Sequence, residues 1–233
     1  MVASRASELT RHFFWRFFEN DLVSPDADIH ETASFLLAFL VAPCVLEVPG
    51  LAFNYGNSFT PPLERIGMIV GDQFGYVSWS MLVAALVATL VWDAFALDAR
   101  DHAVLGPLPI APREMIAAKL RATGAFLLAL VVCANGVSAV AFALLAPGPS
   151  STLGAALSLL FGHVVACAAA ALFGFFVVLA LRGLFANLLG PRLFARIGLA
   201  LQFLIALACV VGYLAWSAQS LENGAWAIYL SPP

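Results

Sequence analysis

Three ionisable side chains lie in or at the edge of long apolar stretches, and they are the first candidates for chemistry: Glu47, Asp93 and His163. A charged side chain at mid-membrane costs about 3 kcal/mol on insertion scales, so each should face protein or water, or be neutral. Glu47 is the strongest candidate, as a contact for a proton or a polar substrate. The alternative is a carboxylate that lies near the headgroups or snorkels at a kink. Asp93 is expected to contact water or a nearby arginine.

Catalysis by these residues would need a second reactive group at a workable spacing. The chain contains no H-E-x-x-H and no G-x-S-x-G motif, and its single lysine, Lys119, does not follow a glycine as a Walker-A lysine does. The four cysteines lie one each in separate apolar runs: Cys44, Cys133, Cys167 and Cys209. This spacing is typical of buried apolar side chains rather than of zinc ligands. We therefore predict no catalytic residue, cofactor or metal site in this chain, and we expect His163 to hydrogen-bond to a neighbouring helix.

The composition sets the class of protein that must position these residues. Of 233 residues, 62% are apolar and only 11% are charged, and the mean hydropathy is +0.94. Soluble domains carry about 25% charged residues, so this chain has too little polar surface for a water-soluble globule. The net charge of -3 also argues against a nucleic-acid partner. The sequence predicts an all-α integral membrane protein, because its apolar runs are long and not alternating.

Residues 1–32 form the first predicted unit, a cytoplasmic amphipathic helix followed by an acidic linker. On a helix, Leu9, Phe13 and Phe17 share one face, whereas Arg11 and Arg16 lie on the other. This pattern predicts a helix that lies in the membrane interface. The alternative is a helix packed on soluble protein.

Residues 33–217 are predicted to form the transmembrane domain, with an external tail at 218–233. The apolar runs place five spans near 33–54, 74–97, 120–146, 151–181 and 194–217. Pro43 and Pro49 predict a kinked or partly re-entrant first span. Ten of the eleven Lys and Arg residues fall on one set of alternate loops, which places the N-terminus in the cytoplasm and the C-terminus outside.

The most specific stretch is a charged, proline-rich segment between the second and third spans, at residues 98–119. Gly106, Pro107 and Pro109 should break the helix that leaves the membrane, and Pro112 can begin the next one. The pattern predicts a rigid helix–turn–helix on the cytoplasmic face. Its alternative is a solvated loop without a partner.

Residues 93–121 resemble the coupling region of permease subunits of type-2 ATP-binding-cassette exporters. The residues that carry the resemblance are Asp98, Arg100, Asp101, Val104, Leu105, Gly106, Pro107, Leu108, Pro109 and Arg113. The resemblance implies that they contact a partner ATPase, which would bind ATP and magnesium. It also implies a second permease domain in a homo- or heterodimer, and a location in the inner membrane, which we expect to be bacterial.

The same resemblance implies export of a lipid, glycan, peptide or drug-like substrate. The family's minimum domain has six spans, so a chain with five is expected to lack the C-terminal part. Two alternatives from other classes remain: an ATP-independent secondary transporter or channel using Glu47 and Asp93, and a structural membrane subunit without transport of its own. A membrane enzyme acting on lipid is a further alternative.

Small residues recur every four positions along the fourth predicted span. They are Gly154, Ser158, Gly162, Ala166, Ala170 and Gly174. Such a stripe lets membrane helices approach closely, so we predict a packing face against another span or a second protomer. The alternative is chance, because alanine is abundant here.

Overall fold

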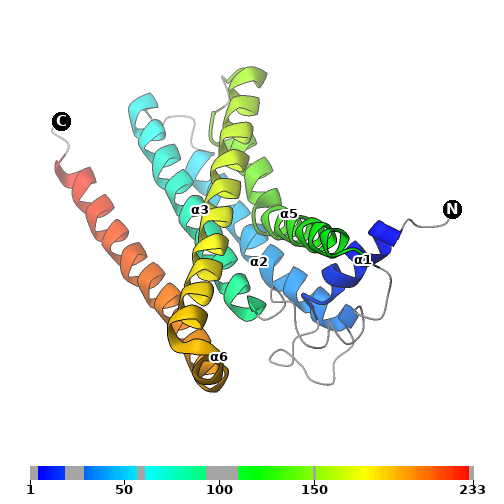
Figure 1. The fold of residues 1–233 in the computed structure, drawn as a ribbon. Helices are drawn as coiled ribbons and strands as arrows, with labels where there is room; N and C mark the ends of the chain where they lie inside the picture. Colours follow the sequence, from blue (N-terminus) through cyan, green and yellow to red (C-terminus); the bar gives the residue numbers. More distant parts are fainter. Residues whose placement is uncertain (1–4, 19–28, 57–60, 93–109, 149–150, 231–233) are drawn as a thin grey trace.

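The computed structural model describes residues 5–18, 29–56, 61–92, 110–148 and 151–230. Within these ranges the regular structure is helical and contains no strand (Figure 1). The helices are α1 (Arg5–Trp15), α2 (Ile29–Tyr55), α3 (Pro62–Leu90), α5 (Pro112–Leu145) and α6 (Leu153–Leu230). A break at Gly190, where φ is 72° and ψ is 162°, divides α6 into two arms that form a V in Figure 1.

Four helical segments are long and apolar enough to cross a membrane. They are Leu63–Leu90, Pro112–Leu145, Leu153–Gly190 and Arg196–Ala215. The apolar part of α2, Leu40–Tyr55, is shorter than these four. The chain therefore has the helical architecture of a membrane protein, in agreement with the predicted class, while the orientation of the termini stays a prediction.

Two helices extend beyond their predicted bounds. α3 begins at Pro62 rather than near residue 74, because proline suits the first helical turn and Glu64 follows it at the positive end of the helix dipole. The first arm of α6 continues to Gly190, so the connection expected at 182–193 is mostly helical. α2 is helical across both Pro43 and Pro49.

The apolar face of α1 packs against the first half of α5. Leu9, Phe13 and Phe17 are buried, and the Phe17 ring stacks on Phe126 with centroids 4.6 Å apart. The ammonium of Lys119 lies 5.4 Å from the centre of the Phe13 ring. The predicted division into an apolar and a polar face is confirmed, and protein rather than solvent covers the aromatic residues.

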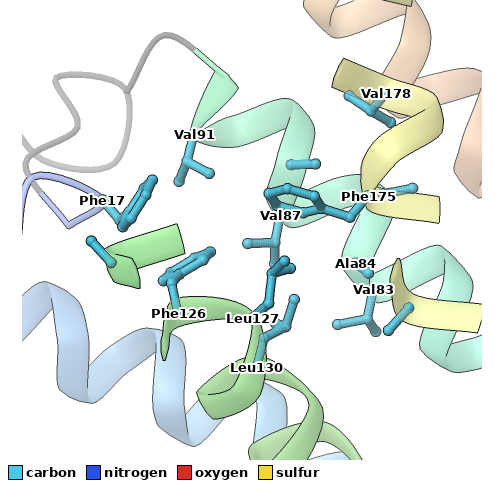
Figure 2. Packing of buried hydrophobic residues seen from close by; sticks show 14 of the residues in the cluster. Phe17, Val83, Ala84, Val87, Val91, Phe126, Leu127, Leu130, Phe175 and Val178 are labelled. Carbon is cyan, nitrogen blue, oxygen red and sulfur yellow. The ribbon is translucent and has the colours of Figure 1, made fainter. Parts of the chain in front are cut away.

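α5 contacts each of the other described helices, and α3 packs mainly against α6. The small residues Ala84 and Ala88 of α3 are fully buried, which allows the helices on either side to approach closely. Figure 2 shows Phe126 of α5 and Phe175 of α6 in one cluster of buried side chains with Val83 and Val87 of α3. The core thus lies where α3, α5 and α6 meet, and α1 packs against one side of it.

An arginine makes contacts at each end of the bundle. At one end, which we call the basic end, α1 packs on α5, and the Arg182 guanidinium lies 6.0 Å from the Trp92 ring and 5.9 Å from the Phe194 ring. At the opposite end, Arg65 in the first turn of α3 donates to Ala146 O at 3.3 Å and to Tyr55 O at 3.4 Å. Arg65 therefore satisfies the last carbonyls of α5 and α2, which have no partner within their own helices.

Gly174 provides a test of the contact between α3 and α6. A Cβ at this position would lie 2.5 Å from Met81 O, so Gly174→Ala forces the two backbones apart and should destabilise the protein by about 1–3 kcal/mol. The matched control is Gly162→Ala on the same helix, where a Cβ meets nothing within 4 Å. Thermal unfolding in detergent should show a lower midpoint for Gly174→Ala alone. Equal midpoints for the two variants would contradict the close approach.

Arg65 provides a second test, at the other end of the bundle. Arg65→Ala leaves the carbonyls of Tyr55 and Ala146 without this donor and should cost about 1–3 kcal/mol of stability. Arg192→Ala, an exposed arginine near the basic end, is the control. The measurement is the midpoint of thermal unfolding, and an Arg65→Ala midpoint equal to that of the control would show that the contacts contribute little.

Candidate functional site

A cavity of about 310 Å³ lies among α2, α3 and the second arm of α6. Its wall includes two carboxylates, three aromatic side chains and three glycines. The lining residues are Glu47, Gly50, Leu51, Asn54, Gly71, Asp72, Gly75, Tyr76, Trp79 and Tyr213. Its volume falls in the range of small-molecule sites, about 300–1,000 Å³.

The two carboxylates are held by a reciprocal exchange of hydrogen bonds between α2 and α3. Tyr55 of α2 donates its hydroxyl to Asp72 Oδ2 of α3 at 2.7 Å, and Tyr76 of α3 donates to the Glu47 carboxylate of α2. Hydrogen bonds to a carboxylate are stronger than neutral ones. Each acid is therefore fixed in position, while its other lone pairs stay available to a ligand.

The cavity exists because its floor is made of glycines. A Cβ added at Gly50, Gly71 or Gly75 would meet no atom within 4 Å, so larger side chains there would extend into free space. The side of the cavity is aromatic, with the rings of Trp79 and Tyr213 6.1 Å apart. The Trp79 indole nitrogen is buried and has no hydrogen-bond partner among the described residues.

His163 lies behind the cavity rather than in its wall. Its side chain is 1% exposed, its Nδ1 lies 2.9 Å from Gln73 Oε1 of α3, and its ring contacts Tyr76 with centroids 5.0 Å apart. The Cys167 thiol lies 3.6 Å from Nε2. The prediction that His163 hydrogen-bonds to a neighbouring helix is confirmed, and the contact supports the Tyr76 ring from behind.

A second group of polar residues links α3 to α5. The Ser80 hydroxyl lies 2.7 Å from Asn135 Oδ1, and Asn135 Nδ2 donates to Val131 O at 3.2 Å. Ser138 donates to Asn135 O at 3.0 Å, and the Cys44 thiol of α2 contacts Ala134 O. All of these side chains are buried, so the group acts as a polar contact inside an apolar bundle.

The predicted coupling residues fall mostly outside the described part of the chain. Asp93 also lies outside it, together with Asp98, Arg100, Asp101, Val104, Leu105, Gly106, Pro107, Leu108 and Pro109. Arg113 is described, and it is exposed in the first turn of α5.

The small-residue stripe packs against α3 at one end only. Gly174 is buried on Met81, and Ala166 and Ala170 are half-buried. The other members, Gly154, Ser158 and Gly162, are exposed in the single chain. The upper part of the stripe is thus available to lipid or to a second protomer.

The sequence pattern indicates Glu47 but not the residues that surround it. Asp72 falls before the span predicted near 74–97, because the polar residues ahead of it hide the start of α3. A signal was present, since Asp72, Tyr76 and Ser80 are four residues apart and therefore share one face of a helix. Tyr213 could not be found in this way, because its place in the wall depends on the break at Gly190.

The arrangement can bind a positive charge or carry a proton. The carboxylates supply negative charge, the aromatic faces attract cations, and the hydroxyls hold the acids in place. Among the described residues, no three His, Cys, Asp or Glu side chains come together as a metal site requires.

A comparison of the chain with family models, curated proteins and solved structures finds no match in any of the three.

Substitution of His163 tests whether its contacts with Gln73 and the Tyr76 ring stabilise the protein. His163→Phe keeps the ring but leaves Gln73 Oε1 without its partner, so it should cost about 1–3 kcal/mol of stability. Val164→Ala, on the exposed side of the same helix, should have little effect. Thermal unfolding in detergent distinguishes the two, and a His163→Phe midpoint equal to the wild-type value would contradict a stabilising role.

Proposed function

We propose that this chain is the transmembrane subunit of an ATP-driven exporter of the type-2 ATP-binding-cassette class. A partner ATPase would bind ATP and magnesium and would dock on residues 98–113. The observation that supports the proposal best is the amphipathic helix α1, because the exporter family that residues 93–121 resemble has an amphipathic connecting helix at its N-terminus.

The described residues on either side of the coupling segment belong to the basic end. α3 ends at Leu90, and the next residues reach Trp92, which contacts the ring of Phe194. α5 begins at Pro112, and Ile110 just before it packs against the core that holds α1. A force applied between these residues would therefore act on α3 and α5 at the same end of the bundle.

Such a force would reach the cavity through α3. This helix carries Asp72, Tyr76 and Trp79, and its backbone is in close contact with Gly174 of α6. Tilting α3 would change the distance between Tyr76 and Glu47, and so the shape of the cavity. In the proposed mechanism, ATP-driven closure of the partner opens and closes this space, and a second permease domain completes the path.

The exposed apolar surface of α6 provides room for the bilayer and for that second domain. Large side chains on this surface are Leu157, Phe161, Phe173 and Phe176, each more than half exposed in the single chain. Leu157 and Phe161 are next to the exposed part of the small-residue stripe at Gly154, Ser158 and Gly162, and Phe173 and Phe176 lie further along the same helix. We propose that this surface contacts lipid and the second protomer in the inner membrane of a bacterial cell.

A second function has a specific observation in its favour. The carboxylates of the cavity suit an ATP-independent secondary transporter that exchanges protons for its substrate. Transport that survives ATP depletion and stops when the proton gradient is collapsed would favour this alternative.

Site-specific crosslinking tests the proposal directly. A photo-crosslinking amino acid at Val104 or Leu108 should capture in cells a protein that mass spectrometry identifies by its Walker-A and Walker-B motifs. The matched control is the same amino acid at Thr152, in the exposed turn before α6 at the other end of the bundle. Capture at neither coupling position, or equal capture at Thr152, would reject the ATPase assignment.

A further inference from the structure

The cavity among α2, α3 and α6 combines features that select one class of ligand. Of the described residues that line it, none is Lys, Arg or His, so the lining offers no cation to balance Glu47 and Asp72. Glu47 is exposed in the single chain and Asp72 is half-buried, and within a membrane a carboxylate without a partner is costly unless a proton or another cation joins it.

The aromatic wall argues that the cation is an organic one. Tyr76, Trp79 and Tyr213 line the same cavity as the two carboxylates, and aromatic faces attract ammonium groups. A proton needs no space of about 310 Å³. A calcium or magnesium ion takes about six oxygen ligands, whereas the described lining supplies, besides tyrosine hydroxyls, only the carboxylates of Glu47 and Asp72 and the amide of Asn54.

We propose that this cavity binds an organic ammonium ion with an apolar body. Its charged group would lie between Glu47 and Asp72, which Tyr76 and Tyr55 hold in place. Its apolar part would pack on Trp79 and Tyr213 over the glycine floor. That the bound cation is also cargo rests on the proposed transport function, whereas the binding itself does not.

Gly71 and Gly75 make the space for this ligand and allow it to be filled. A side chain added at either position meets no protein atom within 4 Å at its first carbon, so Gly75→Leu should enter the cavity without disturbing the helix. Because leucine also has the higher helix propensity, the variant should fold at least as well as the wild type. It removes the space and keeps both carboxylates.

The experiment is calorimetric titration of the purified 233-residue chain in detergent, without any ATPase. The probe is benzyltrimethylammonium, and neopentylbenzene, in which carbon replaces the charged nitrogen, is its neutral analogue. The charged probe should bind, and the neutral one should bind at least about ten-fold more weakly. Equal binding of the two would overturn the inference, because the cavity would then be an apolar space only.

Three variants localise the site. Glu47→Gln and Asp72→Asn should each weaken binding about ten-fold, and Gly75→Leu should abolish it. Glu64→Gln, an exposed carboxylate in the first turn of the same helix, should leave the affinity unchanged. Gel filtration checks that each variant is folded, and wild-type affinity in Gly75→Leu would place the ligand elsewhere even if an acid variant failed to fold.

Competition separates the organic cation from an inorganic one. Sodium or potassium chloride at millimolar concentration should not displace the probe, and displacement in proportion to the salt would identify a metal-ion site instead. The outcomes are independent of the crosslinking experiment. If the probe binds but no ATPase is captured, the cavity assignment stands and the ATP-driven mechanism is rejected. If an ATPase is captured but the probe does not bind, the cavity assignment is rejected and the ATP-driven mechanism stands.

Discussion

The exchange of tyrosine hydroxyls between α2 and α3 is the interaction on which the arrangement of the polar residues depends. Tyr55 reaches Asp72 and Tyr76 reaches Glu47, so each helix supplies one acid and one donor. In an apolar surrounding, a polar group without a partner costs several kcal/mol, so such pairs fix which faces of two helices can meet. The cavity lies beside these pairs because glycines, rather than side chains, fill the remaining positions.

α3 connects this polar region to the rest of the bundle. It contacts α5 through Ser80 and Asn135, and it contacts α6 through the close approach of Met81 and Gly174. The two contacts differ in nature, since one is a directional hydrogen bond and the other is a steric fit. A helix held in both ways is fixed relative to its neighbours in direction as well as in distance.

The sequence allowed the class and the approximate positions of the helices to be predicted, because composition and length decide whether a segment is stable in lipid. The amphipathic pattern of Leu9, Phe13 and Phe17 likewise predicted which face of α1 is buried. The start of α3 was missed because its first turns are polar, and hydropathy does not distinguish a polar helix from a loop. The cavity could not be predicted for another reason. Its residues come from segments as far apart in the sequence as Glu47 and Tyr213, and only tertiary packing brings them together.

The break at Gly190 has a consequence for the order in which the protein assembles. Its φ of 72° suits glycine, and it lets the second arm of α6 return along α3, where Gln202 donates to Thr89 O and Tyr213 reaches the wall near Trp79. Because a chain is made from its N-terminus, α2 and α3 are complete well before Tyr213 is. The wall beside Trp79 is therefore finished only when the second arm of α6 has packed along α3.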